Sequence, residues 1–169
     1  MTLLARLASD VQLMFRRPPR QQYGALCYRV GDDDKLEVLL MTSRDTGRWV
    51  IPKGWPMNGK CAHEVAAQEA MEEAGVKGSV EMETLGAYSY PKVLRDGVRV
   101  SCKVQVYPLE VTGMAKNFKE KGERTIEWVS FDEAAGRVRE PELRHLFLAF
   151  KRKLTDRLSA KAAKQIPAE

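Results

Sequence analysis

The tightest limit on how this 169-residue chain can fold comes from residues 51–76, IPKGWPMNGKCAHEVAAQEAMEEAGV. The first part of the segment is rich in proline and glycine, which is typical of a loop. Small and apolar residues then recur every three or four positions, as on one stripe of a helix. These residues are Ala62, Val65, Ala66 and Ala70. Because Gly75 stands where a glycine commonly ends a helix, the segment predicts a loop followed by a helix over residues 60–74.

Three glutamates of this predicted helix share one side. With about 3.6 residues per turn, Glu69 lies three and four positions before Glu72 and Glu73, so the three carboxylates are neighbours. Without a partner these like charges would repel one another. A hard divalent cation such as magnesium would relieve the repulsion and bridge to phosphate oxygens. A solvated acidic face is the ordinary explanation of such a run, but the glycine-bearing loop and the spacing together favour a metal site.

The same segment resembles the box of the Nudix hydrolase family, G-x5-E-x7-R-E-U-x-E-E-x-G-U, in which U is apolar. The residues that match stand at the family spacing and are Gly54, Glu69, Ala70, Glu72, Glu73, Gly75 and Val76. The lead-in RWVIPKG and the run EWVSFDEA at residues 127–134 are similar to the diphosphoinositol polyphosphate and diadenosine polyphosphate branch. The resemblance covers about residues 22–148. It implies an α/β fold of the Nudix type, an α/β/α sandwich with a mixed central sheet.

The resemblance also implies a metal cofactor, magnesium or manganese, bound by the carboxylates of Glu69, Glu72 and Glu73 and by the backbone carbonyl of Gly54. Such a metal would bridge to the diphosphate of the substrate and lower the pKa of an attacking water. Family members differ in which carboxylate is the general base, so Glu69 is the first candidate and Glu120, from a polar loop, is the second. A solvated loop glutamate is an equally good explanation of Glu120.

Two positions depart from the family pattern. Lys60 stands in place of the first glutamate of the box, and Gln68 stands in place of its arginine. In the family these two side chains are expected to interact and to hold the loop against the helix. Because both are changed together, we interpret them as an exchange of one structural pair for another, with activity retained.

A substrate crowded with phosphates needs fixed cations. Arginine can hold phosphate oxygens in a bidentate manner, whereas lysine acts as a compact charge. Arg44 and Lys53 are the preferred ligands, since both stand where the related branch places phosphate-contacting groups. Further candidate contacts are Arg20, Ser43, Gly54 and Arg124. Arg48 is equally consistent with a surface residue.

Among the aromatic residues, Trp55 is the one placed to shape the mouth of a pocket, because it follows the first glycine of the box. Trp49 and Trp128 lie in strand-like runs, which is more typical of core residues. Candidates for stacking on an adenine are Tyr88, Tyr90 and Phe118.

The chain divides into three segments. Residues 1–20 are an N-terminal segment, in which an amphipathic helix at residues 3–15 ends at the linker RRPPR. Residues 21–158 are the predicted Nudix hydrolase domain. Residues 159–169 are a basic C-terminal tail, whose end is expected to fray.

Within the domain, apolar runs bounded by turn residues predict strands. These are residues 23–30, 36–42, 49–51, 79–90, 98–111 and 125–131. Residues 113–124 are polar and predict a loop. Asp132 is expected to cap a short helix, and apolar residues at helical spacing predict a last helix over residues 142–158.

Composition excludes several classes of protein. With 44% hydrophobic and 30% charged residues, the chain is neither a disordered tail, a collagenous fibre nor a membrane protein. It contains no stretch of the roughly 20 apolar residues that span a bilayer, and we expect its N-terminus to be retained. The three cysteines are odd in number and form no CxxC pair, which favours a reducing, cytoplasmic compartment.

The net charge of +5 favours an anionic partner. The first hypothesis is a magnesium-dependent Nudix phosphohydrolase, a pyrophosphohydrolase that cleaves a diphosphate linkage in a diphosphoinositol polyphosphate or a diadenosine polyphosphate. The alternative is a polyphosphate- or RNA-binding module with weakened catalysis, which Lys60, Gln68 and the net charge suggest. The intact box glutamates oppose that alternative. A third, weaker hypothesis is an enzyme that sanitises 8-oxo-nucleotides. The expected partner is thus a phosphate-rich small molecule rather than nucleic acid, and the sequence predicts no oligomeric state.

Overall fold

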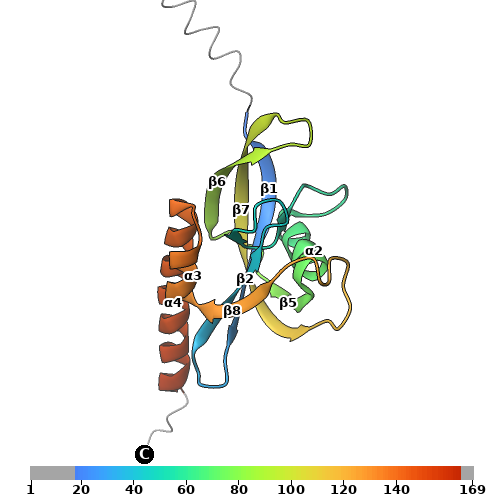
Figure 1. Cartoon of the computed structure of the whole chain (residues 1–169). Coiled ribbons are helices and arrows are strands. Elements are labelled where there is room, and N and C mark those ends of the chain that lie inside the picture. Colours follow the sequence, from blue (N-terminus) through green and yellow to red (C-terminus); the bar gives the residue numbers. More distant parts are fainter. Residues whose placement is uncertain (1–17, 165–169) are drawn as a thin grey trace, which may run out of the picture.

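The computed structural model describes residues 18–164, and its centre is one mixed sheet with helices on both faces (Figure 1). The strands are β1 (Arg20–Val30), β2 (Leu36–Thr42), β3 (Trp49–Val50), β4 (Lys53–Gly54), β5 (Val76–Val80), β6 (Gly86–Val93), β7 (Arg99–Met114) and β8 (Ile126–Ser130). The helices are α2 (Ala62–Ala74), α3 (Phe131–Arg137) and α4 (Pro141–Lys164). The amphipathic helix expected at residues 3–15 lies outside the described residues.

The long strand β7 organises the sheet. Its 16 residues run parallel to β1, in register from Arg20 opposite Cys102 to Tyr28 opposite Glu110. On its other side β7 pairs antiparallel with β6 and then with β5. β2 extends the sheet beyond β1 and pairs with β3 and β8, while the short β4 pairs with β1. One parallel pair among antiparallel pairs makes the sheet mixed, as the resemblance implies.

The two faces of the sheet have separate apolar cores. Successive side chains of a strand point to opposite faces. Along β1, Ala25 and Cys27 therefore join the core beneath α2, while Leu26 and Tyr28 join the core beneath α3 and α4. In Figure 1 the sheet accordingly lies between α2 on one side and the pair α3 and α4 on the other. The expected α/β/α sandwich is confirmed.

The strand expected at residues 79–90 is in fact two strands, β5 and β6. The chain bends between them, and the hydroxyl of Thr84 holds the bend by accepting a hydrogen bond from the Gly86 amide at 3.1 Å. The same hydroxyl lies 3.0 Å from the Val106 carbonyl of β7, to which it can donate. The sequence of residues 79–90 does not reveal such a bend, because apolar residues occur on both sides of it and both sides pair with the same long strand.

The helices after β8 also differ from expectation. Ser130, and not Asp132, caps α3, because the Ser130 hydroxyl accepts a hydrogen bond from the Glu133 amide at 3.1 Å. Asp132 lies inside the first turn and pairs with Lys151. α4 runs to Lys164, past the expected end at residue 158, since alanine and lysine in this stretch are strong helix formers.

Local contacts fix both ends of α2. At its start, the Cys61 amide donates to Glu64 Oε2 at 2.7 Å. At its end, Gly75 has a left-handed φ of +69°, and its amide donates to the Met71 carbonyl at 3.0 Å. The ring of Phe118 packs so closely that a Cβ on Gly75 would lie 2.5 Å from a ring carbon. The segment after β7 is therefore packed against the end of α2.

Replacing Gly75 with alanine is expected to lower the melting temperature by about 4–8 °C. The left-handed backbone costs a residue with a Cβ about 1–2 kcal/mol, and displacement of Phe118 adds to this cost. Gly59→Ala is the matched control, because Gly59 has a φ of +74° but no atom within 4 Å of the place that a Cβ would take. Thermal unfolding followed by circular dichroism measures both variants, and equal losses would show that the Phe118 contact contributes nothing.

Candidate active site

A cleft of about 230 Å³ lies beside α2, β4 and the segment after β7. The glutamates of α2 line it together with Glu120, and basic side chains surround them. All the candidate site residues except Arg20 line this cleft, namely Ser43, Arg44, Lys53, Gly54, Glu69, Glu72, Glu73, Glu120 and Arg124. Arg20 lines a hollow next to it. Candidate residues that are up to 81 positions apart, Ser43 and Arg124, are thus brought to one cleft.

Glu69 lies directly against the backbone of β4. A Cβ on Gly54 would come 2.0 Å from Glu69 Oε1, so only glycine leaves room for this carboxylate. Burial raises the pKa of Glu69, and the neighbouring charge of Glu72 raises it further. The first glycine of the box therefore allows a carboxylate to approach the main chain at the end of β4.

Glu73 is the most buried of the three carboxylates, with 7% of the residue exposed. Its Oε2 accepts no hydrogen bond from the described residues, although Arg124 Nη2 lies 3.4 Å away. Burial raises the pKa of Glu73 to about 7, against the opposing charges of Arg124 and Lys53. A buried carboxylate oxygen without a hydrogen bond needs another partner.

Glu72 has a different environment. Gln68 Nε2 donates a hydrogen bond to Glu72 Oε1 at 2.9 Å, and Lys119 Nζ lies 3.2 Å from Glu72 Oε2. The Gln68 hydrogen bond is the main reason that the pKa of Glu72 is lowered, and the charge of Lys60 contributes to it. The two residues that depart from the family pattern both act on Glu72, and the described residues show no bond between them.

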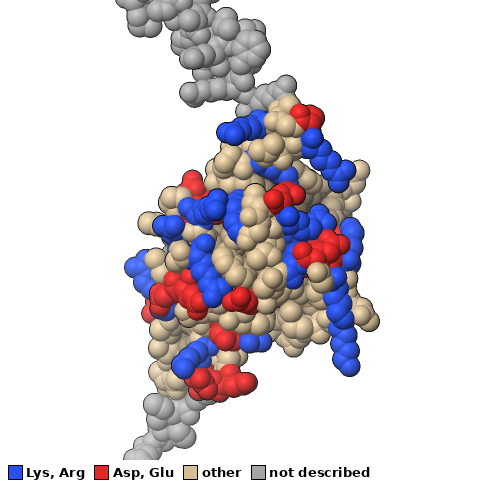
Figure 2. Space-filling model, viewed as in Figure 1, with Lys and Arg blue, Asp and Glu red and all other residues tan. Residues whose placement is uncertain are grey.

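Alternating charges join the cleft to the segment after β7. Arg124 is nearly buried and contacts Glu120 at 2.9 Å, and it donates to the Thr42 carbonyl at 3.0 Å. Arg44 is half exposed and lies 3.2 Å from Glu120 and 2.8 Å from Glu123. Acidic and basic side chains are correspondingly mixed on the face that Figure 2 shows. Glu120 is thus held between two arginines and is not a freely solvated loop residue.

Lys53 lines the cleft and is half-buried, with its Nζ 5.2 Å from the centre of the Tyr90 ring. Burial lowers its pKa to about 8, and the charge of Glu73 opposes that shift. The Tyr90 hydroxyl donates to Gln22 Oε1 at 2.6 Å, which holds the ring in place. Lys53 therefore brings positive charge close to the carboxylates.

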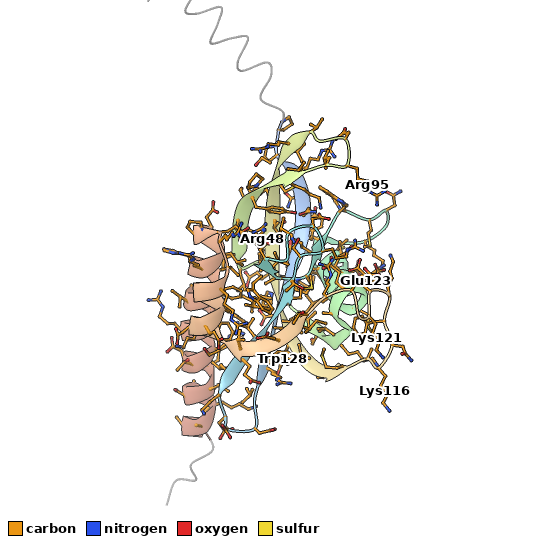
Figure 3. The ribbon with its side chains drawn as sticks, in the orientation of Figure 1. Arg48, Arg95, Lys116, Lys121, Glu123 and Trp128 are labelled. Carbon is orange, nitrogen blue, oxygen red and sulfur yellow. The ribbon has the colours of Figure 1, made fainter. Side chains whose placement is uncertain are left out.

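Arg48 lies neither in this cleft nor on the surface. Its guanidinium forms a buried ion pair with Glu140, in the turn between α3 and α4, and lies 5.4 Å from the Tyr90 ring. Arg48 is labelled in Figure 3. This ion pair could not be predicted from sequence spacing, because Arg48 and Glu140 are 92 residues apart.

The aromatic residues divide into two groups. Trp55 and Tyr90 line the cleft, and Trp55 is 38% exposed. Tyr88 is buried in the core and Phe118 packs on Gly75, so neither presents its ring to the cleft. Trp49 and Trp128 pack against the two cores, as expected for strand residues.

The carboxylates fit a magnesium ion. Within residues 18–164 no three His, Cys, Asp or Glu side chains form a ready-made metal cage. Magnesium does not need one, since it is usually bound through one or two carboxylates, several waters and substrate phosphates. The oxygen of Glu73 that has no hydrogen bond and the Glu69 carboxylate against β4 are groups of this kind.

Family comparison agrees with this fold. The model of the NUDIX domain matches residues 20–157, so the chain belongs to the Nudix family. Nudix hydrolase 16, mitochondrial, of Arabidopsis thaliana is 31% identical over 82% of this chain and 83% of its own length. Nudix hydrolase 12, mitochondrial, of the same plant is 33% identical over 60% of this chain, and that match spans only about half of the relative, 51%. These comparisons place the chain with the pyrophosphohydrolases, as expected.

Solved structures support the same fold. A C. elegans Ap4A hydrolase in a binary complex superposes with a TM-score of 0.60 at 20% identity, covering 81% of this chain and 98% of that one.

Both plant relatives named above carry mitochondrial names, so a cytoplasmic location of this chain stays a prediction. None of the described helices is long and apolar enough to cross a membrane.

Proposed function

We propose that this chain is a magnesium- or manganese-dependent pyrophosphohydrolase that cleaves a diphosphate linkage in a diphosphoinositol polyphosphate or a diadenosine polyphosphate. Two neighbouring carboxylates carry the proposal. Glu73 has a buried oxygen without a hydrogen bond among the described residues, and the Glu69 carboxylate packs on Gly54. Both lie in a cleft that also holds Arg44 and Lys53. Carboxylates for a cation beside cations for phosphates suit a metal-bridged diphosphate.

Glu69, Glu72, Glu73 and the Gly54 carbonyl would hold the metal. When bound, it would neutralise the charge that builds up on the transferring phosphoryl group and lower the pKa of the attacking water. The water oxygen forms a bond to phosphorus as the bridging P–O bond breaks, and two phosphate products leave.

Within this scheme Glu69 is the better general base of the two candidates. Its carboxylate lies against Gly54 and forms no ion pair within 4 Å among the described residues, so it is available to accept a proton from water. Glu120 is engaged by Arg124 and Arg44, so its proposed part is to position these arginines. Arg44, Lys53 and Ser43 would then orient the phosphates.

The test is phosphate release from a panel of substrates with magnesium or manganese. The panel contains diphosphoinositol pentakisphosphate, diadenosine tetraphosphate, ADP-ribose and 8-oxo-dGTP, and the control is the Glu72→Gln/Glu73→Gln double variant. We expect metal-dependent cleavage of one of the first two substrates, which the control lacks. Tight binding without turnover across the panel would instead favour the polyphosphate- or RNA-binding module.

A further inference from the structure

A second hollow, of about 560 Å³, adjoins the proposed catalytic cleft. Arg44, Asp45, Trp55 and Lys92 line both spaces, so the two are continuous. We call the second space the cationic groove. Its further lining comes from Arg20 at the start of β1, from Val93 at the end of β6, and from Leu94 and Arg95 in the turn between β6 and β7. Figure 3 shows Arg95 on the same side of the sheet as Glu123.

Within residues 18–164, most of the positive charge of the groove has no ion-pair partner. Four cations and one acid, Asp45, line it. Among the described residues, Arg44 pairs with glutamates, whereas Arg20, Lys92 and Arg95 form no ion pair within 4 Å. Cations gathered in a concave site raise the local concentration of an anionic ligand.

Trp55 stands where the cleft and the groove meet, since its side chain lines both. The Lys92 ammonium lies 5.7 Å from the centre of the Trp55 ring, within the range of a cation–π contact. This contact holds one of the free cations at the junction without using a carboxylate. The exposed indole also offers a flat apolar face beside the cations.

We propose that the cationic groove binds a second phosphate-bearing group of the same substrate, beyond the diphosphate that is cleaved. The proposal rests on the proposed function, because it takes the carboxylate cleft as the place of cleavage. It makes Lys92, Arg95 and Arg20 specificity-determining residues. Substrates that carry a further phosphate beyond the cleaved diphosphate occupy cleft and groove together, whereas a substrate with that diphosphate alone, such as ADP-ribose, occupies the cleft alone.

The test compares two double variants, each of which removes two positive charges from the β6–β7 hairpin. Lys92→Gln/Arg95→Gln removes two groove cations, and Arg99→Gln/Lys103→Gln removes two exposed cations of β7 outside the groove. We expect the first variant to raise KM for diadenosine tetraphosphate or diphosphoinositol pentakisphosphate about tenfold or more, with kcat little changed. The second variant is expected to leave KM near that of the unaltered protein.

Calorimetric binding of inositol hexakisphosphate and of ATP, without metal, provides a readout that does not depend on turnover. Both are expected to bind at least tenfold more weakly to the groove variant than to the control. Trp55→Ala separates the two sources of phosphate, since it should weaken ATP through a lost stacking face and leave inositol hexakisphosphate largely unaffected.

Equal KM values and equal affinities for the two double variants would overturn the groove while leaving the proposed function intact. Failure of the unaltered protein to cleave any panel substrate with metal would instead overturn the proposed function. A groove variant that loses turnover of ADP-ribose as strongly as that of the longer substrates would also contradict a separate second subsite.

Discussion

Glu73→Gln is expected to lose about 100-fold or more in turnover and, without metal, to unfold at a higher temperature than the unaltered protein. The loss of turnover follows from removing a buried charged oxygen that is proposed to hold the metal, since metal stabilisation of a transition state amounts to several kcal/mol. The gain in stability follows from the same burial. The folded protein disfavours the ionised carboxylate, and glutamine carries no charge.

The sign of this stability effect depends on pH. The pKa of Glu73 rises from 4.5 to about 7 on folding, so between these values the folded chain binds more protons than the unfolded chain. Stability contributed by this group therefore falls as the pH rises through that interval. We expect Glu73→Gln to gain on the order of 2 kcal/mol at pH 8 and little at pH 4.5.

Thermal unfolding in a chelating buffer at the two pH values, together with a turnover assay, measures both effects. Glu83→Gln serves as the control, because Glu83 is exposed and lies outside the cleft. Near-normal turnover of Glu73→Gln would contradict the proposed metal site. A stability difference that does not change between pH 4.5 and pH 8 would contradict the environment described for Glu73.

Arg48→Met is expected to cost about 3–5 kcal/mol of stability, the largest loss from a single polar residue that we foresee. The Glu140 side chain is only 7% exposed, and its Oε2 already accepts no hydrogen bond among the described residues. Without Arg48 this carboxylate would be left buried and charged with no partner. The melting temperature is expected to fall by about 6–20 °C.

A double variant and a surface control make the result specific. Arg48→Met/Glu140→Leu removes both charges together and is expected to regain most of the lost stability, because no buried charge is left unpaired. Arg157→Met breaks an exposed pair with Glu81, and its expected cost is about 0–1 kcal/mol. Urea unfolding measures all three variants, and a double variant as unstable as Arg48→Met would show that the pair stabilises by another route.

The sequence alone predicts those parts of the site that depend only on residues close together in the chain. Glu69, Glu72 and Glu73 fall on one side of α2 because their spacing follows the helical period. Gly75 ends that helix because it adopts a left-handed backbone conformation, which glycine accepts without strain. The sheet that is covered on both faces is implied by the resemblance of residues 51–76 to the Nudix box.

Other features depend on contacts between distant residues, and periodicity says nothing about them. Arg48 and Glu140 meet across 92 positions, and neither lies in a motif. Lys92 and Arg95 have the sequence pattern of ordinary solvated charges, and only the β6–β7 turn brings them to the groove beside Trp55. The division of residues 79–90 into β5 and β6 is set by the partner strand and not by their own apolar character.

The parallel pairing of β1 with β7 also determines when the site can form. From Arg20 to Tyr28, each residue of β1 meets a partner 82 positions later, so the central pair closes a very long loop. Closing a long loop lowers the entropy of the chain before stabilising contacts have formed, so such strand pairs form slowly. α2 precedes β7 in the chain, and the segment with Glu120 and Arg124 follows it. The carboxylates of α2 and the segment with Glu120 and Arg124 therefore come together only once the sheet has closed.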